Sequence, residues 1–332
     1  VKGGNRARTD GREGRPDAAL DVVVTVFAGR AYLIRSLEAL LAGRATGRLA
    51  VHVPLDQSIP EPAELAELFP SVNFIHLDGV RTPAELRAAG VAAGSARFVA
   101  LTEDHCIPAP EWAERVIAEH EAPHTAIGGV LEKVEPAGSR DSGYSWALYL
   151  SDWGRHMPPV EEGSADYLTD CNVSYERAAL EPLRELWEEE FHETPVNWAL
   201  QGRSESLWLS PRLVVRQQRS LSLAEAVRDR YGFGRPFAAT RVEATGLLQR
   251  MATAGGSLLL SAVLTARVAA TVWRKGRARG TFSRAVPALL VTTTVWAIGE
   301  LTGYVAGRPP PGLRPRSHRG GGPRRRSDGG VA

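Results

Sequence analysis

Three consecutive polar residues, Glu103, Asp104 and His105, follow the apolar run of residues 98–101 after Thr102. Open α/β sheets bind ligands at the carboxyl ends of their parallel strands, so this turn is suited to binding one. Carboxylate oxygens are the ligands that Mg²⁺ and Mn²⁺ prefer, and a histidine is acceptable to Mn²⁺. A divalent ion at this turn could bridge a diphosphate. The alternative is that the acidic turn only caps the helix that follows Pro108.

Other motifs for catalysis or cofactor binding are missing from the sequence. The first turn reads FAGRAY, with one Gly in place of G-x-G-x-x-G, so a hydride-transfer enzyme is not expected. Neither a P-loop nor a G-x-S-x-G elbow occurs. Cys106 and Cys171 are too few for a disulfide framework, and they lack the spacing of a zinc site. The acidic turn is what remains.

Alternating elements must position this turn. The β-branched run Asp21–Phe27 predicts a strand covered on both faces, and residues 32–41 follow with helical periodicity. Further strands are expected over 49–55, 72–77 and 97–101, and helices over 63–69 and 83–93. Short connections between such elements predict an α/β fold with a mainly parallel sheet and helices on both faces.

The second half of this region is less regular. We expect helices over 111–120, 175–190 and 193–202, and strands over 125–131 and 207–215. Residues 136–165 contain several aromatics without a period, which is typical of a binding loop or lid.

Charge is distributed unevenly along the chain. The formal net charge is +2, but seven Arg and one Asp after residue 306 leave −4 for the rest. A nucleic-acid-binding protein would carry its positive charge on the folded body, so no nucleic acid partner is expected.

Two apolar segments lie near the C-terminus, over 251–273 and 285–306, each long enough to cross a bilayer core of roughly 30 Å. Between them, WRKGRARGTFSR carries five positive charges. A spanning hairpin would place this linker and the Arg-rich tail on opposite sides, so the positive-inside tendency cannot satisfy both. The alternatives are a spanning hairpin, an interfacial or re-entrant pair, and soluble core helices; membrane contact is favoured. Because no apolar signal region precedes Ala18, we expect the body on the cytoplasmic face of the cell membrane.

Four segments together resemble the inverting family-two glycosyltransferases with the GT-A fold. DVVVTVFAGRAYLIRSLEALLAG resembles their opening strand and helix, and LTEDHCIPAPEW resembles their metal turn. TDCNVSYERAAL and FHETPVNWALQGRSESLWLSPRLVV resemble their later GxNxxxRRxxL segment and the segment that holds the catalytic base. The segments keep the family's order over residues 20 to about 216. His105 and Thr194 depart from the pattern, because aspartate is more common at both positions.

Composition and hydropathy, together with the resemblance for the second of them, divide the chain into four expected regions: a disordered leader (1–19), a GT-A domain (20–243), two apolar membrane-associated helices with a basic linker (244–306) and a disordered Arg/Gly/Pro-rich tail (307–332). The resemblance also implies a site. The nucleotide-sugar donor would be bound by Thr25, Phe27, Ala28, Asp56, Arg81, Glu103 and Asp104.

Mn²⁺ or Mg²⁺ is expected at Asp104 and His105, although which residue of the acidic turn ligates the ion stays open. Glu193 matches the base that deprotonates the acceptor hydroxyl. His192 either orients this carboxylate or is the base itself, and Asp170 and Asn172 frame the acceptor side. The neighbouring run 188–190 is expected to be a solvated helix face.

The implied activity is that of a metal-dependent, hexosyltransferase-like enzyme. It would move a single sugar, with inversion, from a nucleotide diphosphate sugar to a glycan or lipid-linked acceptor, in the synthesis of a cell-surface polysaccharide or glycolipid. The Q-x-x-R-W sequence of processive synthases is missing, which favours single transfer. The altered metal turn suggests the alternative, a catalytically silent GT-A module that acts as a membrane-bound partner in glycan assembly.

Overall fold

The computed structural model describes residues 8–9, 18–60, 62–135, 142–219, 221–242 and 246–307. A mixed ten-stranded sheet forms its centre, with the strand order β1-β4-β3-β2-β5-β9-β7-β10-β6 and β8 paired to β10. The strands are β1 (Arg8–Thr9), β2 (Leu20–Thr25), β3 (Leu49–Leu55), β4 (Val72–His76), β5 (Phe98–Glu103), β6 (Cys106–Pro108), β7 (Ala126–Lys133), β8 (Gly163–Ser164), β9 (Val173–Glu176) and β10 (Leu207–Gln217).

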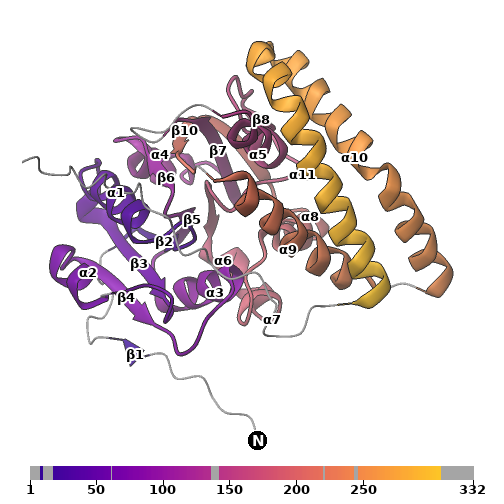
Figure 1. Ribbon diagram of the computed structural model, residues 1–332. Coiled ribbons are helices and arrows are strands. Elements are labelled where there is room, and N and C mark those ends of the chain that lie inside the picture. Colours follow the sequence, from indigo (N-terminus) through magenta and orange to yellow (C-terminus); the bar gives the residue numbers. More distant parts are fainter. Residues whose placement is uncertain are drawn as a thin grey trace, which may run out of the picture.

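Helices cover both faces of this sheet (Figure 1). The helices are α1 (Arg30–Leu41), α2 (Pro62–Leu68), α3 (Pro83–Ala93), α4 (Trp112–Glu119), α5 (Gly143–Trp153), α6 (Arg177–Leu180), α7 (Arg184–Trp187), α8 (Glu193–Gly202), α9 (Leu223–Val242), α10 (Leu247–Lys275) and α11 (Arg279–Ala306), with two 3₁₀ turns, η1 (Thr46–Arg48) and η2 (Glu181–Leu183). The predicted α/β fold with a mainly parallel sheet is therefore confirmed.

The strand pairing explains how the sheet is mixed. Strands β2, β3, β4 and β5 are parallel neighbours, as the short strand–helix connections predict. Strand β9 then lies antiparallel between β5 and β7. Strand β10 runs parallel to β7, and β6 pairs with it antiparallel.

Alternating side chains of the central strands enter two different cores. Val22 and Val24 of β2 pack into the core under α1, α2 and α4. Val23, between them, packs into the core under α3, α6, α7 and α8. A strand buried on both faces has no polar positions to alternate with apolar ones, which is why this run is continuously β-branched.

Two expected segments differ in the structure. The stretch 136–165 was expected to be irregular, but α5 occupies Gly143–Trp153, and Tyr149 and Trp153 are buried in the core; residues 136–141 lie outside the described part. The helix expected over 175–190 is also wrong. Residues 173–176 form β9, and the rest is divided among α6, η2 and α7.

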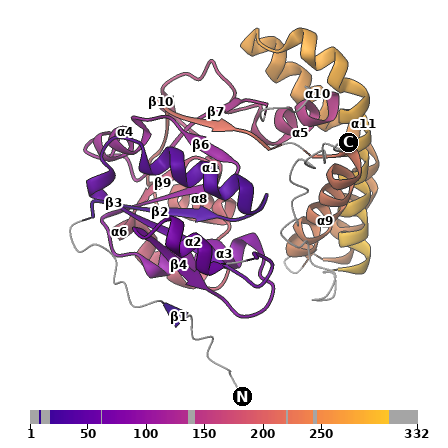
Figure 2. The same cartoon turned by 60° about the vertical axis from the view of Figure 1, so that its left-hand side comes forward.

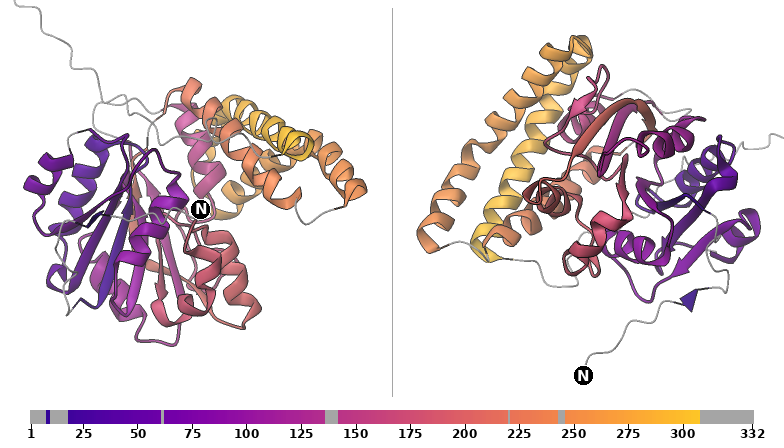
Figure 3. Two further views of the ribbon diagram at one scale, coloured as in Figure 1. Left: turned by 90° about the horizontal axis from the view of Figure 1, so that it is seen from below. Right: turned by 180° about the vertical axis from the view of Figure 1, so that it is seen from behind.

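The C-terminal helices lie together on one side of the sheet domain (Figures 2 and 3). Apolar residues of α10 and α11, including Val272 and Leu289, belong to the same buried core as α5. Helix α11 is long and apolar enough to cross a membrane. Within α10, 249–257 and 259–275 pass the same test only as a pair, bent by 62°. The regions expected to be disordered, 1–19 and 307–332, lie mostly outside the described residues.

Candidate active site

The carboxyl ends of parallel strands bring the predicted donor residues to one edge of the sheet. Thr25, at the end of β2, is directly paired in register with Glu103, at the end of β5. Asp56 directly follows β3, the neighbour of β2 on the other side. This edge is where a ligand binds in an open α/β sheet.

Asp104 anchors the turn that follows β2. Its carboxylate is fully buried and accepts hydrogen bonds from the backbone N–H of Ala28, at 2.8 Å, and of Gly29, at 2.7 Å. Gly29 has a φ of 108°, a conformation that a residue with a Cβ rarely adopts. Those two bonds reach Oδ2, and Oδ1 also accepts from the Ala28 N–H, at 3.0 Å. Both oxygens of Asp104 therefore have partners within the protein, and its role as a metal ligand stays a prediction.

Arg87 joins the donor edge to the acceptor side, and sequence reasoning missed it. Its buried guanidinium donates to Glu103 Oε1 at 2.8 Å and forms an ion pair with Asp170 Oδ2. A signal was available, because Arg87 lies three residues after Ala84 and four before Val91, on the buried stripe of α3. A charged residue on such a stripe requires buried partners.

Glu193 is the first residue of α8 and is only partly exposed. Its Oε1 accepts hydrogen bonds from Tyr167 Oη at 3.0 Å and from Thr194 Oγ1 at 3.2 Å. Burial raises the pKa of Glu193, the negative charge of Asp170 raises it further, and Arg87 opposes both effects. A carboxylate with a raised pKa is better suited to accept a proton near neutral pH.

Asp170 has a similar electrostatic environment. Burial raises the pKa of Asp170 first; Arg87 opposes this, and Glu103 adds a like charge. Burial also raises the pKa of Tyr167, as do the charges of Glu193 and Asp170, so its hydroxyl stays a donor. Three carboxylates thus surround one guanidinium, and the excess negative charge favours a proton or a cation.

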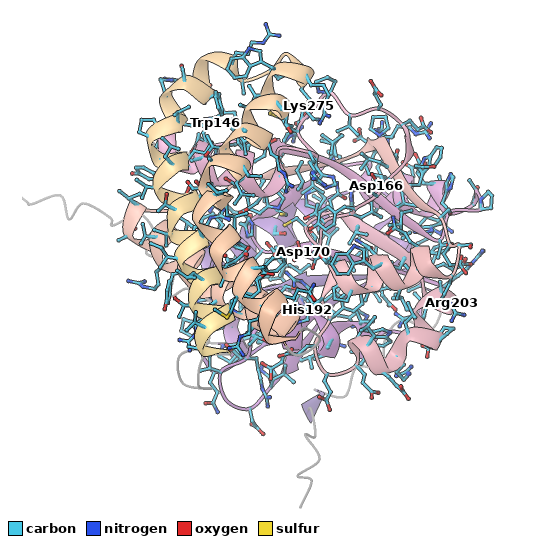
Figure 4. All side chains as sticks on the ribbon, turned by 90° about the vertical axis from the view of Figure 1, so that its right-hand side faces the viewer. Trp146, Asp166, Asp170, His192, Arg203 and Lys275 are labelled. Atoms are coloured by element: carbon cyan, nitrogen blue, oxygen red, sulfur yellow. The ribbon has the colours of Figure 1, made fainter. Side chains whose placement is uncertain are left out.

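Figure 4 shows Asp170 between the C-terminal helices and α8, with His192 below it. His192 precedes α8 and is exposed, and its Nε2 lies 3.3 Å from Glu190 Oε2. Asn172, by contrast, is buried. Its Nδ2 donates to the carbonyls of Val130 and Leu213, and its Oδ1 accepts from Trp112 Nε1.

Three of the expected donor-binding residues, at the end of β2 and just after it, lie next to α9. Thr25 is fully buried, and Phe27 and Ala28 are nearly so. The Phe27 ring stacks on Phe233 of α9 with a centroid distance of 6.0 Å, and the Arg219 guanidinium lies 4.1 Å from the Phe27 centroid. A cation–π contact between Arg219 and Phe27 therefore forms part of the donor edge of the sheet.

Asp56 and Arg81 hold two neighbouring loops together. Asp56 Oδ2 accepts the backbone N–H of Arg81 at 2.7 Å, and Oδ1 accepts the backbone N–H of Ser58 at 2.9 Å. The Arg81 side chain donates to the carbonyl of Asp78 and to Glu85. Their contact with a nucleotide stays a prediction.

Oxygen donors suited to a divalent ion lie at the acidic turn that follows β5. Glu103 and Asp170 each offer a carboxylate oxygen within 4.8 Å of the other and of Cys171 Sγ. Carboxylate oxygens are the ligands that Mg²⁺ and Mn²⁺ prefer, and Asp170 is partly exposed, so these residues fit such an ion.

Comparisons with known proteins agree with this fold. The model of glycosyl transferase family 2 matches residues 21–184, and no curated protein matches the sequence. Among solved structures, the chain is similar to the mannosyltransferase PcManGT from Pyrobaculum calidifontis in complex with GDP-Man and Mn²⁺, with 13% identity and a TM-score of 0.52 over 89% of this chain and 90% of that chain. It is also similar to GalNAc-T7 with UDP, GalNAc and Mn²⁺, with 13% identity and a TM-score of 0.47 over 61% of this chain and 44% of that chain. The family match and the first structure confirm the predicted GT-A-like fold.

Proposed function

Residues 21–184 belong to glycosyl transferase family 2, and from this premise we propose that the protein transfers a single sugar from a nucleotide diphosphate sugar to an acceptor hydroxyl, with inversion. The observation that carries the proposal is the position of Glu193. It is partly exposed at the start of α8 and shares one electrostatic cluster with Asp170, Arg87 and Glu103. The charge of Arg87 thus couples Glu193, the proposed catalytic base, to Glu103 at the end of β5, where the donor binds.

Inversion requires the acceptor oxygen to attack the anomeric carbon from the face opposite the nucleotide, while a carboxylate removes its proton. Glu193 performs this step, because Tyr167 fixes its Oε1 and burial raises its pKa. His192, which is exposed and next to Glu193, contributes to the acceptor side. Asn172 positions the loop before β9, since its amide bonds three groups of the protein.

The donor occupies the edge formed by β2, β3 and β5. Asp56 and Arg81 border the nucleotide, and the turn anchored by Asp104 places Ala28 beside the nucleobase. Glu103 and Asp170 would hold a divalent ion, which would supply positive charge to the leaving diphosphate. The mannosyltransferase structure named above contains GDP-Man together with Mn²⁺, which supports this class of donor.

Membrane association completes the proposal: the enzyme acts on a glycan or lipid-linked acceptor at the cytoplasmic face of the cell membrane. Helix α11 has the length and hydropathy of a spanning helix. Large apolar side chains of both C-terminal helices are exposed, among them Met251, Leu259, Ile298 and Val305. An exposed apolar surface of this kind is typical of a membrane or protein contact.

The test is a panel of nucleotide diphosphate sugars, added to the purified full chain with and without Mn²⁺. We expect one donor to raise the melting temperature, because a ligand at 100 times its Kd stabilises by about 2.7 kcal/mol. We also expect the same donor to be consumed with an acceptor in a transfer assay. Binding without turnover of any donor, across a broad acceptor set, would contradict the enzyme and favour the silent module.

A further inference from the structure

A small cavity lies where the start of α5 meets the start of α11. Its volume is about 60 Å³, and it is lined by Ser142, Gly143, Trp146, Thr281 and Arg284. A cavity needs about 10–15 Å³ to hold one water molecule, so this one has room for several waters or for one tetrahedral oxyanion. The helices pack tightly beside it, because a Cβ added at Gly143 would lie 2.8 Å from the carbonyl oxygen of Arg284.

Two adjacent residues of α5 at this cavity lack the hydrogen bonds that buried polar groups normally make. Trp146 Nε1 and Ser145 Oγ are buried atoms without a hydrogen-bond partner within the described part of the chain, and Ser145 is only 3% exposed. Roughly 90% of buried polar groups in folded proteins have a partner. Since the indole that carries one of these two atoms lines the cavity, the missing partner is expected to be a ligand inside it.

The chemistry of the lining selects an anion. An indole N–H and a guanidinium can only donate hydrogen bonds, so Trp146 and Arg284 both require an acceptor. Helix α5 also begins here, with the side chain of Ser142 accepting the backbone N–H of Ser145. The remaining N–H groups of the first turn and the positive end of the helix dipole favour negative charge. Lys133 pairs with Glu135 at 2.7 Å, so the positive charge at the cavity comes from Arg284 and the helix.

The basic linker indicates where such an anion comes from. Thr281 and Arg284 lie in the first two turns of α11, directly after the exposed linker residue Arg277. In Figure 4, Trp146 and Lys275 lie at the same end of the C-terminal helices. Anionic lipid headgroups are attracted to a cluster of basic residues of this kind. The cavity is therefore at the end of the helices where lipid phosphates would gather.

We propose that this cavity binds the phosphate group of an anionic membrane lipid. Arg284 pairs with the phosphate, and Trp146 Nε1 and the first-turn N–H groups of α5 donate to its oxygens. The site is separate from the acidic turn, because it is the other end of α5, at Trp153, that approaches His105, with a ring centroid distance of 6.0 Å. It does not depend on sugar transfer, but the source of the phosphate rests on the proposed membrane contact.

The first test measures phosphate alone. The full chain in a neutral detergent, without divalent ions, is titrated calorimetrically with inorganic phosphate and with glycerol 3-phosphate, and about one site per chain is expected. Trp146→Phe keeps the ring but removes its N–H, and Arg284→Gln removes the charge. Each variant is expected to weaken binding about 10-fold or more, because hydrogen bonds to charged groups are strong.

Trp208→Phe is the matched control for the indole. Trp208 Nε1 is also a buried atom without a partner in the described residues, but its ring stacks on His124 of the sheet domain at 4.3 Å. Arg277→Gln is the control for charge, because Arg277 is exposed and does not line the cavity. Both controls should bind phosphate like the unmodified chain. If phosphate binding is missing, or is the same in Trp146→Phe, the cavity holds only water and the proposal is wrong.

Vesicles then distinguish a lipid phosphate from a free one. Trp146→Phe leaves the net charge unchanged, so we expect it to weaken flotation with vesicles that contain phosphatidic acid, while Trp208→Phe floats normally. Both variants should float equally with neutral phosphatidylcholine vesicles, which measure the apolar contact. If Trp146→Phe weakens phosphate binding but floats like the unmodified chain with both kinds of vesicle, the ligand is free phosphate and the lipid assignment is refuted. A full chain that floats with neither kind contradicts the membrane contact and the lipid source together, whatever the result of the transfer assay.

Discussion

At the scale of single residues, the site depends on how one arginine distributes its charge among three carboxylates. Arg87 contacts Glu103 and Asp170 directly, and its charge also lowers the pKa of Glu193, which burial and Asp170 raise. Burial opposes the charged form of Arg87 itself, but Asp170 and Glu103 outweigh this and raise its pKa. The proton affinity of the proposed base is therefore set by residues on α3 and before β9, not by α8 alone.

Glu193→Gln keeps the size and hydrogen bonding of the side chain but removes its basicity. Turnover is expected to fall by about 10²- to 10⁴-fold, while donor affinity from calorimetry changes little. Loss of kcat at constant donor affinity is the signature of an interaction made in the chemical step. Because the pKa of Glu193 is raised, the acidic limb of the pH–kcat profile should lie above the ordinary carboxyl value of 4.5.

Glu188→Gln and Glu189→Gln are the matched controls, because both side chains are exposed on the same acidic segment. They are expected to leave turnover unchanged within about twofold, since isolated surface charges contribute little. If Glu193→Gln retains full turnover while His192→Ala abolishes it, the base is His192.

At the scale of elements, a second buried network fixes the opposite end of the central strands. Asp21 of β2 accepts from Arg177 at 2.6 Å and from the backbone N–H of Ala96 at 2.8 Å, and His52 Nε2 lies 3.0 Å from its Oδ1. The Cβ of any residue replacing Gly94 would lie 2.1 Å from this carboxylate. The network therefore joins β2, β3 and α6 and leaves no room for a larger residue after α3.

This network predicts a pH dependence of stability. Burial alone would raise the pKa of Asp21, but His52, Ala96 and Arg177 together hold it below the ordinary value of 3.8. A carboxyl with a lowered folded-state pKa stabilises the fold above its unfolded-state pKa and loses that contribution as the pH falls through the folded-state value. Asp21→Asn is therefore expected to lower the free energy of unfolding by about 3 kcal/mol at pH 7, because Arg177 loses its buried partner.

Urea unfolding at pH 7 and at pH 3 measures this effect, and the gap between the variant and the unmodified chain should narrow at pH 3. Glu181→Gln, which removes an exposed partner of Arg184, is the control and should change stability by at most about 1 kcal/mol. An equal gap at both pH values would contradict the role of Asp21.

Elements with their own periodicity were predictable from the sequence, and elements defined by distant partners were not. The bounds expected for β3, α3 and α8 agree with the structure because each begins or ends at a clear local signal, such as Pro83 after the capping Thr82. Helix α5 was missed because residues 143–151 carry no charge and most of its side chains are buried, so it has no polar stripe to reveal a period.

Strand β9 was missed for a different reason. Its four residues take the strand conformation because they pair with β5 on one side and β7 on the other, and neither partner is near in sequence. In the site, too, residues in local motifs were predictable, and contacts between distant residues were not. The acidic turn and Glu193 could be proposed from motifs, whereas the contacts of Arg87, Tyr167 and Cys171 exist only after the sheet is assembled.

At the scale of the whole molecule, the C-terminal helices bury some of their apolar side chains in the core and expose others on the surface. Val268, Val272, Phe282 and Leu289 are buried with α5 in the core of the sheet domain. Helix α9 meanwhile places Phe233 against Phe27 at the donor edge. A chain truncated after residue 242 would expose the apolar side of α5, so membrane experiments require the full chain.

The basic linker between α10 and α11 gives the membrane proposal a directional test. Arg274 and Arg277 are exposed at one end of the two helices, next to the exposed Trp273. A cation near an anionic bilayer surface contributes about 1 kcal/mol, and salt screens the attraction. The double substitution Arg274→Gln with Arg277→Gln is therefore expected to weaken flotation with anionic vesicles by about 30-fold, equivalent to about 2 kcal/mol.

The matched control removes two exposed arginines of the sheet domain, Arg184 and Arg203, and should leave flotation unchanged. Figure 4 shows Arg203 at the edge of the sheet domain, away from Lys275 at the end of α10. Neutral vesicles separate the apolar contribution from the charge. The exposed side chains of α10 and α11 should still bind them, and this binding should persist at high salt because apolar burial is not screened. A full chain that stays in the soluble fraction without detergent and floats with neither kind of vesicle would show that these helices pack only against protein.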